Sequence, residues 1–434
     1  YLDDVQVFSD ASARFGDLAR IEVLKGPQGT LYGGSNIGGA VRFVTAKPDP
    51  SDFFGHAMLS AGDQGLLDVE ASLNVPLGGS DWALRLFGMA SSNDGYLSNP
   101  NSARANGLRN ANSRDIGAVD QESVRVAVAG SLTDRLSLHA SVRWNALDGP
   151  NDPWSLELDD DFEFPSGIDL STNPRHERET IGATLEFVYE AEAFTVTSVS
   201  SYTDTDSDRE TDLDNSQEFI LDLFRPQELK VLSQELRFTS TGSGPFEWLA
   251  GLYYLDYEDD LDSTLIFFGG ASLFDGIIPD PSTEQDVVEV VPFEDRLRER
   301  KQQAAFVTAS YRSGDLEFGA GARIDRWEVE TTNRQSSLSG RQSETEFLPR
   351  LSLTWYLDDQ GSNLYATAAR GFEPGGFNLG NFAGSNELFG FEAEEATSYE
   401  VGFKGRFADG SVTLTAAAFL IDYEKRQFEL QAAD

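Results

Sequence analysis

The chain has 434 residues, of which 33 are Lys or Arg and 73 are Asp or Glu, so its formal net charge at pH 7 is −40. This charge argues against nucleic acid and anionic headgroups as partners, because phosphate binding requires clustered positive charge. With no cysteine and only three histidines, the composition excludes disulfides, thiolate zinc sites and a cysteine nucleophile, and it argues against a histidine metal cluster.

The N-terminal residues 1–8, YLDDVQVF, are strand-like. They lack the charged region and the apolar core of a signal peptide, so we expect the natural protein to begin before this chain. The sequence has no run of about 18 apolar residues, and it therefore predicts no membrane-spanning helix.

Residues 19–48, ARIEVLKGPQGTLYGGSNIGGAVRFVTAKP, combine a short apolar strand with a glycine-dense segment. Ile21 and Val23 lie in the strand, Gly26-Pro27 turns it, and the later glycines allow close approaches that a side chain would block. We predict that this segment fits inside a tight space. It lacks the Gly-Lys-Ser/Thr ending of a phosphate loop, and no GxGxxG fingerprint opens a helix after it, so it does not predict nucleotide binding.

This segment resembles the end of the plug domain of TonB-dependent outer-membrane receptors. The family's pattern has an acidic residue in an IEV strand, a basic residue before Gly-Pro, Leu-Tyr-Gly, paired glycines, and a strand ending in Thr-x-x-Pro. The sequence supplies these in order: Glu22, Lys25, Leu31-Tyr32-Gly33, Gly38-Gly39, and Thr45 to Pro48. The resemblance implies that residues 1–48 are the C-terminal part of a plug domain and that residues 49–434 form an incomplete transmembrane β-barrel.

After residue 48, segments of about 9 to 14 residues alternate between apolar and polar positions. In one of them Leu138 and Val142 share a face, while His139 and Arg143 share the other. Strands of soluble sandwiches average about 5 to 6 residues, whereas a tilted strand that crosses the hydrocarbon needs about 9 to 11. The pattern predicts an all-β membrane protein, an antiparallel transmembrane β-barrel.

Short turns and long acidic links alternate along the chain, as they do when the turns face the periplasm and the loops face outside. We count about fifteen strand-like segments, and the resemblance implies twenty-two in the family's barrel. Unpaired backbone groups cost several kcal/mol each in lipid, so we expect the natural protein to continue beyond residue 434 by about seven strands. The long links are expected at residues 93–118, 148–178, 204–227, 259–298, 329–344 and 373–394.

Charged and aromatic residues of these links have two interpretations each. Two acidic groups could hold a hard cation such as calcium, or form a solvated, self-repelling surface. They are the alternating Asp204, Asp206 and Asp208 and the adjacent pair Asp259-Asp260. Neither has the spacing of an EF-hand loop. The aromatic side chains of these links either stack on a ligand or pack the loops against one another. The candidate ligand-facing aromatics are Trp154, Phe377 and Phe382. The residues that best fit an anion-binding patch are Arg104, Arg109 and Arg114, and the alternative is that they form an ordinary solvent-exposed loop face.

Residues 368–378, AARGFEPGGFN, and 398–407, SYEVGFKGRF, again resemble the receptor family. Alternation places Tyr399 and Val401 toward lipid and Glu400 inside. The family has a glutamate at this inner position, facing basic residues of the plug.

The resemblance therefore implies plug-to-barrel contacts among Arg20, Glu22, Lys25 and Glu400, with Glu400 paired to Lys25 or Arg20. The alternative is that these charges merely line a wet lumen.

The resemblance implies a receptor that actively imports a scarce ligand across the outer membrane of a Gram-negative bacterium. Its expected partners are outer-membrane lipid, an extracellular small ligand, and TonB, which acts at the periplasmic face through an N-terminal segment absent from this sequence. A ferric siderophore is the family's commonest cargo; a saccharide, a vitamin or another nutrient is the alternative.

We expect no cofactor and no catalytic residue, because His139 is the only histidine at a convincing water-facing strand position. A passive porin, which needs no glycine-rich plug, and a soluble β-rich binding or adhesion protein are the alternatives from other classes.

Overall fold

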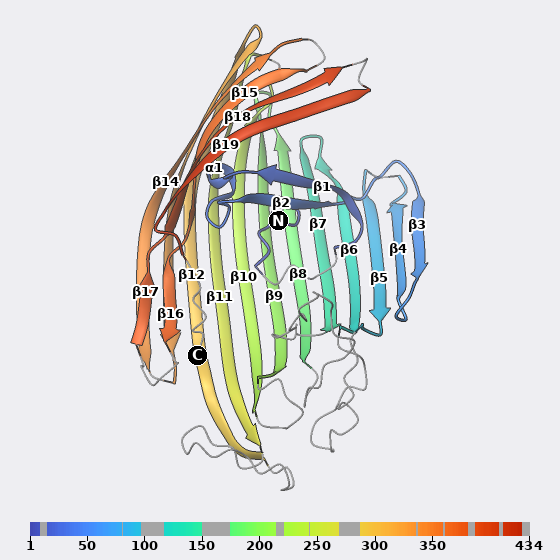
Figure 1. The fold of residues 1–434 in the computed structure, drawn as a ribbon. Coiled ribbons are helices and arrows are strands. Elements are labelled where there is room, and N and C mark those ends of the chain that lie inside the picture. Colours follow the sequence, from blue (N-terminus) through green and yellow to red (C-terminus); the bar gives the residue numbers. More distant parts are fainter. Residues whose placement is uncertain are drawn as a thin grey trace.

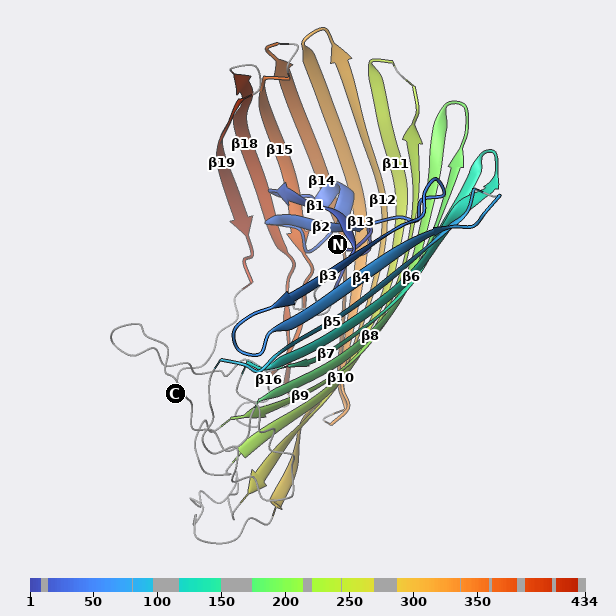
Figure 2. The same ribbon diagram turned by 90° about the vertical axis from the view of Figure 1, so that its right-hand side faces the viewer.

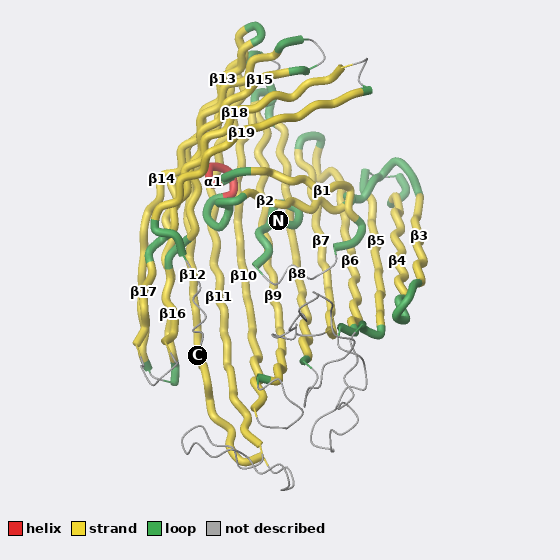
Figure 3. Tube along the Cα trace, viewed as in Figure 1, coloured by secondary structure: helices red, strands yellow, loops and turns green. Residues whose placement is uncertain are grey.

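The structure is a computed structural model that describes residues 1–8, 15–79, 81–96, 117–149, 174–213, 221–242, 244–268, 287–335, 337–358, 361–380, 387–407 and 411–427. Strands dominate it, and it contains one short helix (Figure 3). No helix in these ranges is long and apolar enough to cross a membrane.

One antiparallel sheet of fifteen strands holds most of the described residues (Figure 1), which confirms the expected number. Its edge strands are β3 and β19, and each strand between them pairs with its neighbour in the chain, except that β15 pairs with β18. The strands are β3 (Phe54–Ala61), β4 (Leu67–Pro76), β5 (Ala83–Asn93), β6 (Val119–Thr133), β7 (Leu136–Gly149), β8 (Arg175–Glu190), β9 (Phe194–Asp212), β10 (Leu221–Ser240), β11 (Phe246–Phe268), β12 (Val287–Ser313), β13 (Leu316–Asn333), β14 (Leu338–Tyr356), β15 (Asn363–Glu373), β18 (Glu394–Phe407) and β19 (Val412–Glu424).

A separate hairpin of β16 (Gly376–Gly380) and β17 (Glu387–Phe391) follows β15. It packs against β13 and β14. In chain order this hairpin lies between β15 and β18, which pair directly with each other in the large sheet. It is thus part of a long connection between two neighbouring strands.

Much of what the sequence analysis took for long links is strand, so the expected boundaries of residues 204–227, 259–298 and 329–344 are wrong. β11 has 23 residues and β12 has 27, and they pair along most of their length. Ladder hydrogen bonds need no apolar side chains. The paired strands therefore continue beyond the apolar region, where their side chains are charged. In the sequence such a charged stretch resembles a loop.

The predicted separation of the two faces is confirmed by side-chain exposure. On the outer face Val142 is 54% exposed and Val401 is 58% exposed. On the inner face His139 is 7% exposed, and Arg323 and Asp325 are 1% and 0% exposed. Apolar side chains thus face outward and polar ones face inward, the reverse of a water-soluble sheet.

Aromatic side chains border this outer apolar face. Phe246, Tyr311 and Phe318 stand on adjacent strands near the short turns, and each is about half exposed. Toward the long connections, Tyr254 donates a hydrogen bond to Asp256 (3.1 Å). Phe246 and Tyr254 lie eight positions apart on β11, about 27 Å along the strand at 3.4 Å per residue. At a tilt of about 35–45° this length projects to about 19–22 Å along the barrel axis, close to but below the apolar band of about 25 Å in outer-membrane barrels.

The N-terminal segment (residues 1–8 and 15–48) forms β1 (Leu18–Lys25), α1 (Gly29–Tyr32) and β2 (Gly39–Thr45). β1 and β2 make their own two-stranded sheet, which lies on the concave side of the large sheet (Figure 2). A Cβ atom at Gly29 would come within 2.8 Å of the backbone oxygen of Arg370 on β15. The prediction that this segment fits a tight space is confirmed.

Candidate functional site

A buried ion cluster joins the N-terminal segment to the wall at Asp17. Arg85 of β5 donates to both Asp17 oxygens (2.5 and 2.7 Å), and Arg125 of β6 donates to one of them (3.1 Å). The three side chains are 4%, 9% and 6% exposed. Charged hydrogen bonds removed from water are among the strongest side-chain contacts, provided that each charge is paired. We call this cluster the Asp17 clasp.

Sequence reasoning missed the Asp17 clasp. Its signal is weak but present: Arg85 and Arg125 are the single cations of their strands, and both lie at inward positions. An inward-facing charge needs a partner. The sequence does not say that the partner is Asp17.

A chain of ion pairs makes a second attachment. Arg20 contacts Glu22 (2.6 Å), Glu22 contacts Arg42 (2.9 Å), Arg42 contacts Asp4 (2.6 Å), and Asp4 contacts Arg237 of β10 (2.8 Å). Hydrogen bonds from Arg20 and Arg42 lower the pKa of Glu22. Arg20 and Glu22 thus reach the wall through Asp4 and Arg237.

The expected pairing of Glu400 with Lys25 or Arg20 is wrong. The Glu400 carboxylate accepts a hydrogen bond from the Tyr365 hydroxyl (2.6 Å), while Lys25 is exposed. In the described part of the chain no ion pair links Glu400 to either cation. The reason is local: Gly402 has no side chain, so the Tyr365 ring lies over it and reaches Glu400 across the β15–β18 ladder.

Helix α1 is held against three neighbouring strands. Thr30 donates to the carbonyl of Leu348 on β14 (3.2 Å), and the backbone N–H of Ser35, just after the helix, donates to the carbonyl of Phe372 on β15 (3.0 Å). The Ser35 hydroxyl also contacts the Glu373 carboxylate (2.9 Å). These contacts place the helix at a defined height on the wall.

The third strand, β13, begins a hydrogen-bond chain that leads away from the helix. Arg323 donates to the carbonyl of Leu31 (3.3 Å) and to Asp325 (2.7 Å). Asp325 accepts from Gln302 of β12 (2.9 Å), and Arg300 donates to the Gln302 side-chain oxygen (3.2 Å). Polar contacts therefore connect the N-terminal segment without a break to Arg300, higher on the wall.

Arg300 is one of three arginines in the row RLRER of β12. Residues two apart on a strand share a face, so Arg296, Arg298 and Arg300 all face inward. Asp259 and Glu294 pair with Arg296 (3.0 and 3.1 Å). We define the arginine wall as the inward-facing set Arg209, Arg225, Arg296, Arg298 and Arg300 on β9, β10 and β12.

Sequence reasoning missed the arginine wall because it assigned residues 259–298 to a link. The signal that would have found it is arginine at positions i, i+2 and i+4, which is strand spacing. An inward row of cations is suited to bind an anion.

The acidic run of β9 lies on the opposite face. Asp204, Asp206 and Asp208 alternate with the inward residues of β9 and face outward. Alternation also separates the adjacent pair of β11: Asp259 faces inward to Arg296, and Asp260 faces outward to Arg334 (2.6 Å). These two carboxylates do not share a cation site. The acidic run of β9 therefore lies on the outside of the wall.

Of the expected ligand-facing aromatics, the structure describes Phe377 alone. Its ring lies over Gly340 of β14, where a Cβ atom would be 2.6 Å from the ring, and its carbonyl accepts a hydrogen bond from Arg298 (3.4 Å). Trp154 and Phe382 lie outside the described residues, as do Arg104, Arg109 and Arg114.

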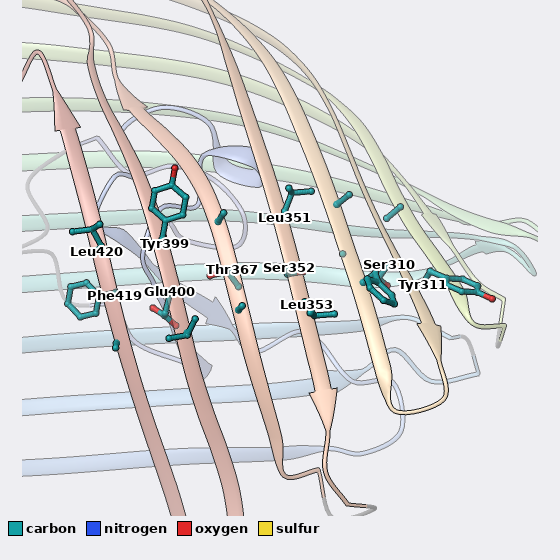
Figure 4. Close-up of a pocket in the computed structure, with 18 of the residues that line it drawn as sticks. Ser310, Tyr311, Leu351, Ser352, Leu353, Thr367, Tyr399, Glu400, Phe419 and Leu420 are labelled. Atoms are coloured by element: carbon teal, nitrogen blue, oxygen red, sulfur yellow. The ribbon is translucent and has the colours of Figure 1, made fainter.

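A large groove on the outer face is not this site. It has a volume of about 930 Å³, and apolar side chains such as Tyr311, Leu351 and Tyr399 line it (Figure 4). Alanines form its floor: Ala309, Ala320, Ala366, Ala368 and Ala418. Since these side chains belong to the outward face, the groove is suited to hydrocarbon chains and is separated from the arginine wall by the sheet itself.

Comparison with known proteins identifies relatives of this arrangement. The family described as "TonB dependent receptor-like, beta-barrel" matches residues 145–434. The pesticin receptors of Yersinia enterocolitica and Yersinia pestis are 26% identical to the chain over 96% of its length. The chain spans 58% of the length of these curated relatives.

Solved structures share the fold. The ferric yersiniabactin uptake receptor FyuA from Yersinia pestis superimposes with a TM-score of 0.81 at 22% identity, covering 98% of this chain and 63% of that one. The siderophore receptor PiuA from Acinetobacter baumannii gives a TM-score of 0.72 at 14% identity, covering 96% and 64%. At these identities the similarity establishes the architecture.

Proposed function

The chain belongs to the TonB-dependent receptor-like β-barrel family, and from this premise we propose that it is part of a gated outer-membrane importer. In this proposal residues 1–48 belong to the plug domain and residues 49–434 form the barrel wall. The family consists of outer-membrane transport receptors rather than enzymes. Import by such a receptor involves binding and movement, and it needs no covalent chemistry.

The observation that carries the proposal is the Asp17 clasp. A passive porin needs an open lumen, and an N-terminal segment held by Asp17 between buried arginines of two strands would obstruct it. A gated importer needs such a segment, because the lumen must stay closed until the ligand is bound. The clasp therefore favours the gated receptor over the porin.

The proposed ligand is an anionic ferric siderophore. The arginine wall supplies cations on the inner face above α1, and charged hydrogen bonds from guanidinium groups favour carboxylate or phenolate oxygens. One of the similar proteins is named as a ferric yersiniabactin uptake receptor and another as a siderophore receptor. A neutral saccharide would make no charge-assisted hydrogen bond with the arginine wall, so it is disfavoured.

The proposed energy source is TonB, acting at the periplasmic face. Opening a path requires the plug to leave its position, which means breaking the Asp17 clasp and the contacts of α1. Ligand binding by itself supplies little of this work, since it occurs on the wall above. Mechanical pulling on the plug is the step that the energy source has to perform.

The test is uptake of radioactive iron by a strain that lacks the gene. Under iron limitation we expect loss of uptake for at least one ferric siderophore and recovery on expression of the full-length protein. Unchanged uptake across a panel of hydroxamate, catecholate and carboxylate siderophores would refute the ligand class. A liposome swelling assay on the purified full-length protein tests gating, because rapid swelling with small sugars would identify a porin.

A further inference from the structure

The groove on the outer face has a defined floor and two flanks. Two alanines of β15, Ala366 and Ala368, form the middle of the floor. The strand register places larger side chains directly opposite them, and all four of these are exposed: Leu351 and Leu353 on β14, and Tyr399 and Val401 on β18. The groove therefore follows β15 between its two neighbours (Figure 4).

The groove continues toward the short turns. A second hollow of about 580 Å³ shares Ala366 and Val401 with the first. It ends beside Trp355, which is 51% exposed, and beside Phe403. The ring of Phe403 covers Gly405, where a Cβ atom would be 2.5 Å from the ring. Aromatic side chains at this end are typical of the border between hydrocarbon and headgroups.

The groove is suited to an occupant that needs no hydrogen bonds. Its floor and flanks are apolar apart from the hydroxyl of Tyr399, and the backbone of β15 pairs with β14 on one side and with β18 on the other. An extended or irregular protein segment placed here would keep unsatisfied backbone groups in hydrocarbon. A hydrocarbon chain has no such groups.

The distance between the flanks excludes a helix. β14 and β18 are both neighbours of β15, so they lie two strand spacings apart, which is about 9.5 Å. The flanking side chains occupy part of this distance, while an α-helix with its side chains is about 10–12 Å across. A single hydrocarbon chain is thin enough to lie on the alanines.

The length and height of the groove correspond to one leaflet of a bilayer. Leu364 and Ala368 both line it and are four residues apart on β15, about 14 Å along the strand. One leaflet is about half of a hydrocarbon core of about 30 Å. Only residues 357–362 separate β14 from β15, and short turns face the periplasm. The groove thus lies in the periplasmic leaflet.

We propose that this groove binds one acyl chain of a phospholipid from the periplasmic leaflet of the outer membrane. The groove is continuous with the apolar outer face, which the membrane covers in barrels of this kind, so the lipid reaches it without leaving the bilayer. A chain in the groove is contacted on three sides, and these added dispersion contacts hold it more firmly than a chain on a flat wall. The inference goes beyond the proposed function and does not depend on which ligand is imported.

The experiment uses the full-length receptor, extracted from outer membranes, washed in detergent and weighed by native mass spectrometry. We expect the wild type to keep a phospholipid through washing. Ala366→Leu and Ala368→Leu each fill the floor, and each should lower the retained fraction about tenfold because the new side chain takes the place of the acyl chain. Ala305→Leu is the matched control. It makes the same change on the outward face of β12, opposite Leu252 and Ile324 and outside the groove, so its retention should equal that of the wild type.

Adding lipid back to the washed receptor identifies the part that is recognised. Palmitoyl-oleoyl phosphatidylethanolamine and single-chain lysophosphatidylethanolamine should both bind, since one chain enters the groove, whereas glycerophosphoethanolamine, which has no chain, should not. Leucine is well accommodated on a face in contact with lipid, so the unfolding midpoint of each variant should match that of the wild type. A loss of lipid then reports the groove rather than misfolding.

Any of five results overturns the proposal. They are no phospholipid on the wild type, unchanged retention in both groove variants, an equal loss in Ala305→Leu, binding of glycerophosphoethanolamine, or release by the groove variants of a different occupant, such as lipopolysaccharide, a second copy of the receptor or another membrane protein. Uptake by cells tests the proposed function separately. If the groove is wrong, iron uptake still requires the gene; if the function is wrong, the deletion strain takes up iron normally, whether or not the receptor keeps its lipid.

Discussion

Replacing Asp17 by Asn removes one negative charge and one of two acceptor oxygens from between two buried guanidinium groups. Asp17 has a φ of 56°, in the left-handed region that Asn tolerates nearly as well as Gly. The substitution also preserves volume and one acceptor oxygen. The effect on docking of the N-terminal segment therefore reports the loss of the charge and of one acceptor oxygen, without a change of shape.

The structure sets the expected magnitude. Removing one partner of a buried ion pair costs about 3–5 kcal/mol. We expect the lower end, about 3 kcal/mol, because the remaining oxygen keeps a hydrogen bond and Arg125 also donates to the Ala46 carbonyl (3.1 Å). Arg85 loses most, since its hydrogen bond to the Ser72 hydroxyl is long at 3.5 Å. Three kcal/mol corresponds to about a 100-fold shift toward the undocked state.

The assay is hydrogen–deuterium exchange of peptides from residues 15–25 in the full-length receptor. Asp49→Asn is the control, because its side chain contacts only the nearby Ser51 in the described structure. We expect the exchange rate in β1 to rise about 100-fold in Asp17→Asn and to stay unchanged in the control variant. A change below threefold, or equal changes in both variants, would refute the claim that the clasp holds the segment.

Three other changes test the remaining parts of the structure. Glu22 has a lowered pKa in the folded state, so its contribution to docking is present above its unfolded pKa and is lost as pH falls through the lowered value. The thermal unfolding midpoint should therefore fall between pH 7 and pH 3 in the wild type, and this pH dependence should be weaker in Glu22→Gln. The same pH profile in both proteins would contradict the chain of ion pairs. Gly29→Ala puts a Cβ atom 2.8 Å from the Arg370 carbonyl, an overpacking that should cost about 1–3 kcal/mol, seen as faster exchange around α1 and not in β3. Val307→Lys places a charge midway along the outer apolar face, where Val307 is 47% exposed; lipid should make it cost about 2–4 kcal/mol in reversible refolding into bilayers, whereas a soluble protein would show almost no change.

The faces of the strands were predictable from the sequence because alternation is a local property. Val142 and Val401 face outward and His139 faces inward as expected, since consecutive side chains of a strand point in opposite directions wherever the strand lies. The tight fit at Gly29 was predictable for a similar reason: a dense run of glycines has few uses other than close backbone approach. The ends of the strands were not predictable from the sequence, because β11 and β12 remain paired through charged residues beyond the apolar region.

The partners of the charges were decided by the tertiary structure alone. Asp17 meets arginines 68 and 108 residues away, and Glu400 meets Tyr365 rather than a basic residue of the N-terminal segment. Which charges meet depends on register, curvature and the height at which α1 docks, none of which has a local signature. The amino-acid sequence by itself thus determined the kind of wall and the direction of each side chain, while the docking of distant segments determined which side chains touch, because contact energies act between residues that only the folded chain brings together.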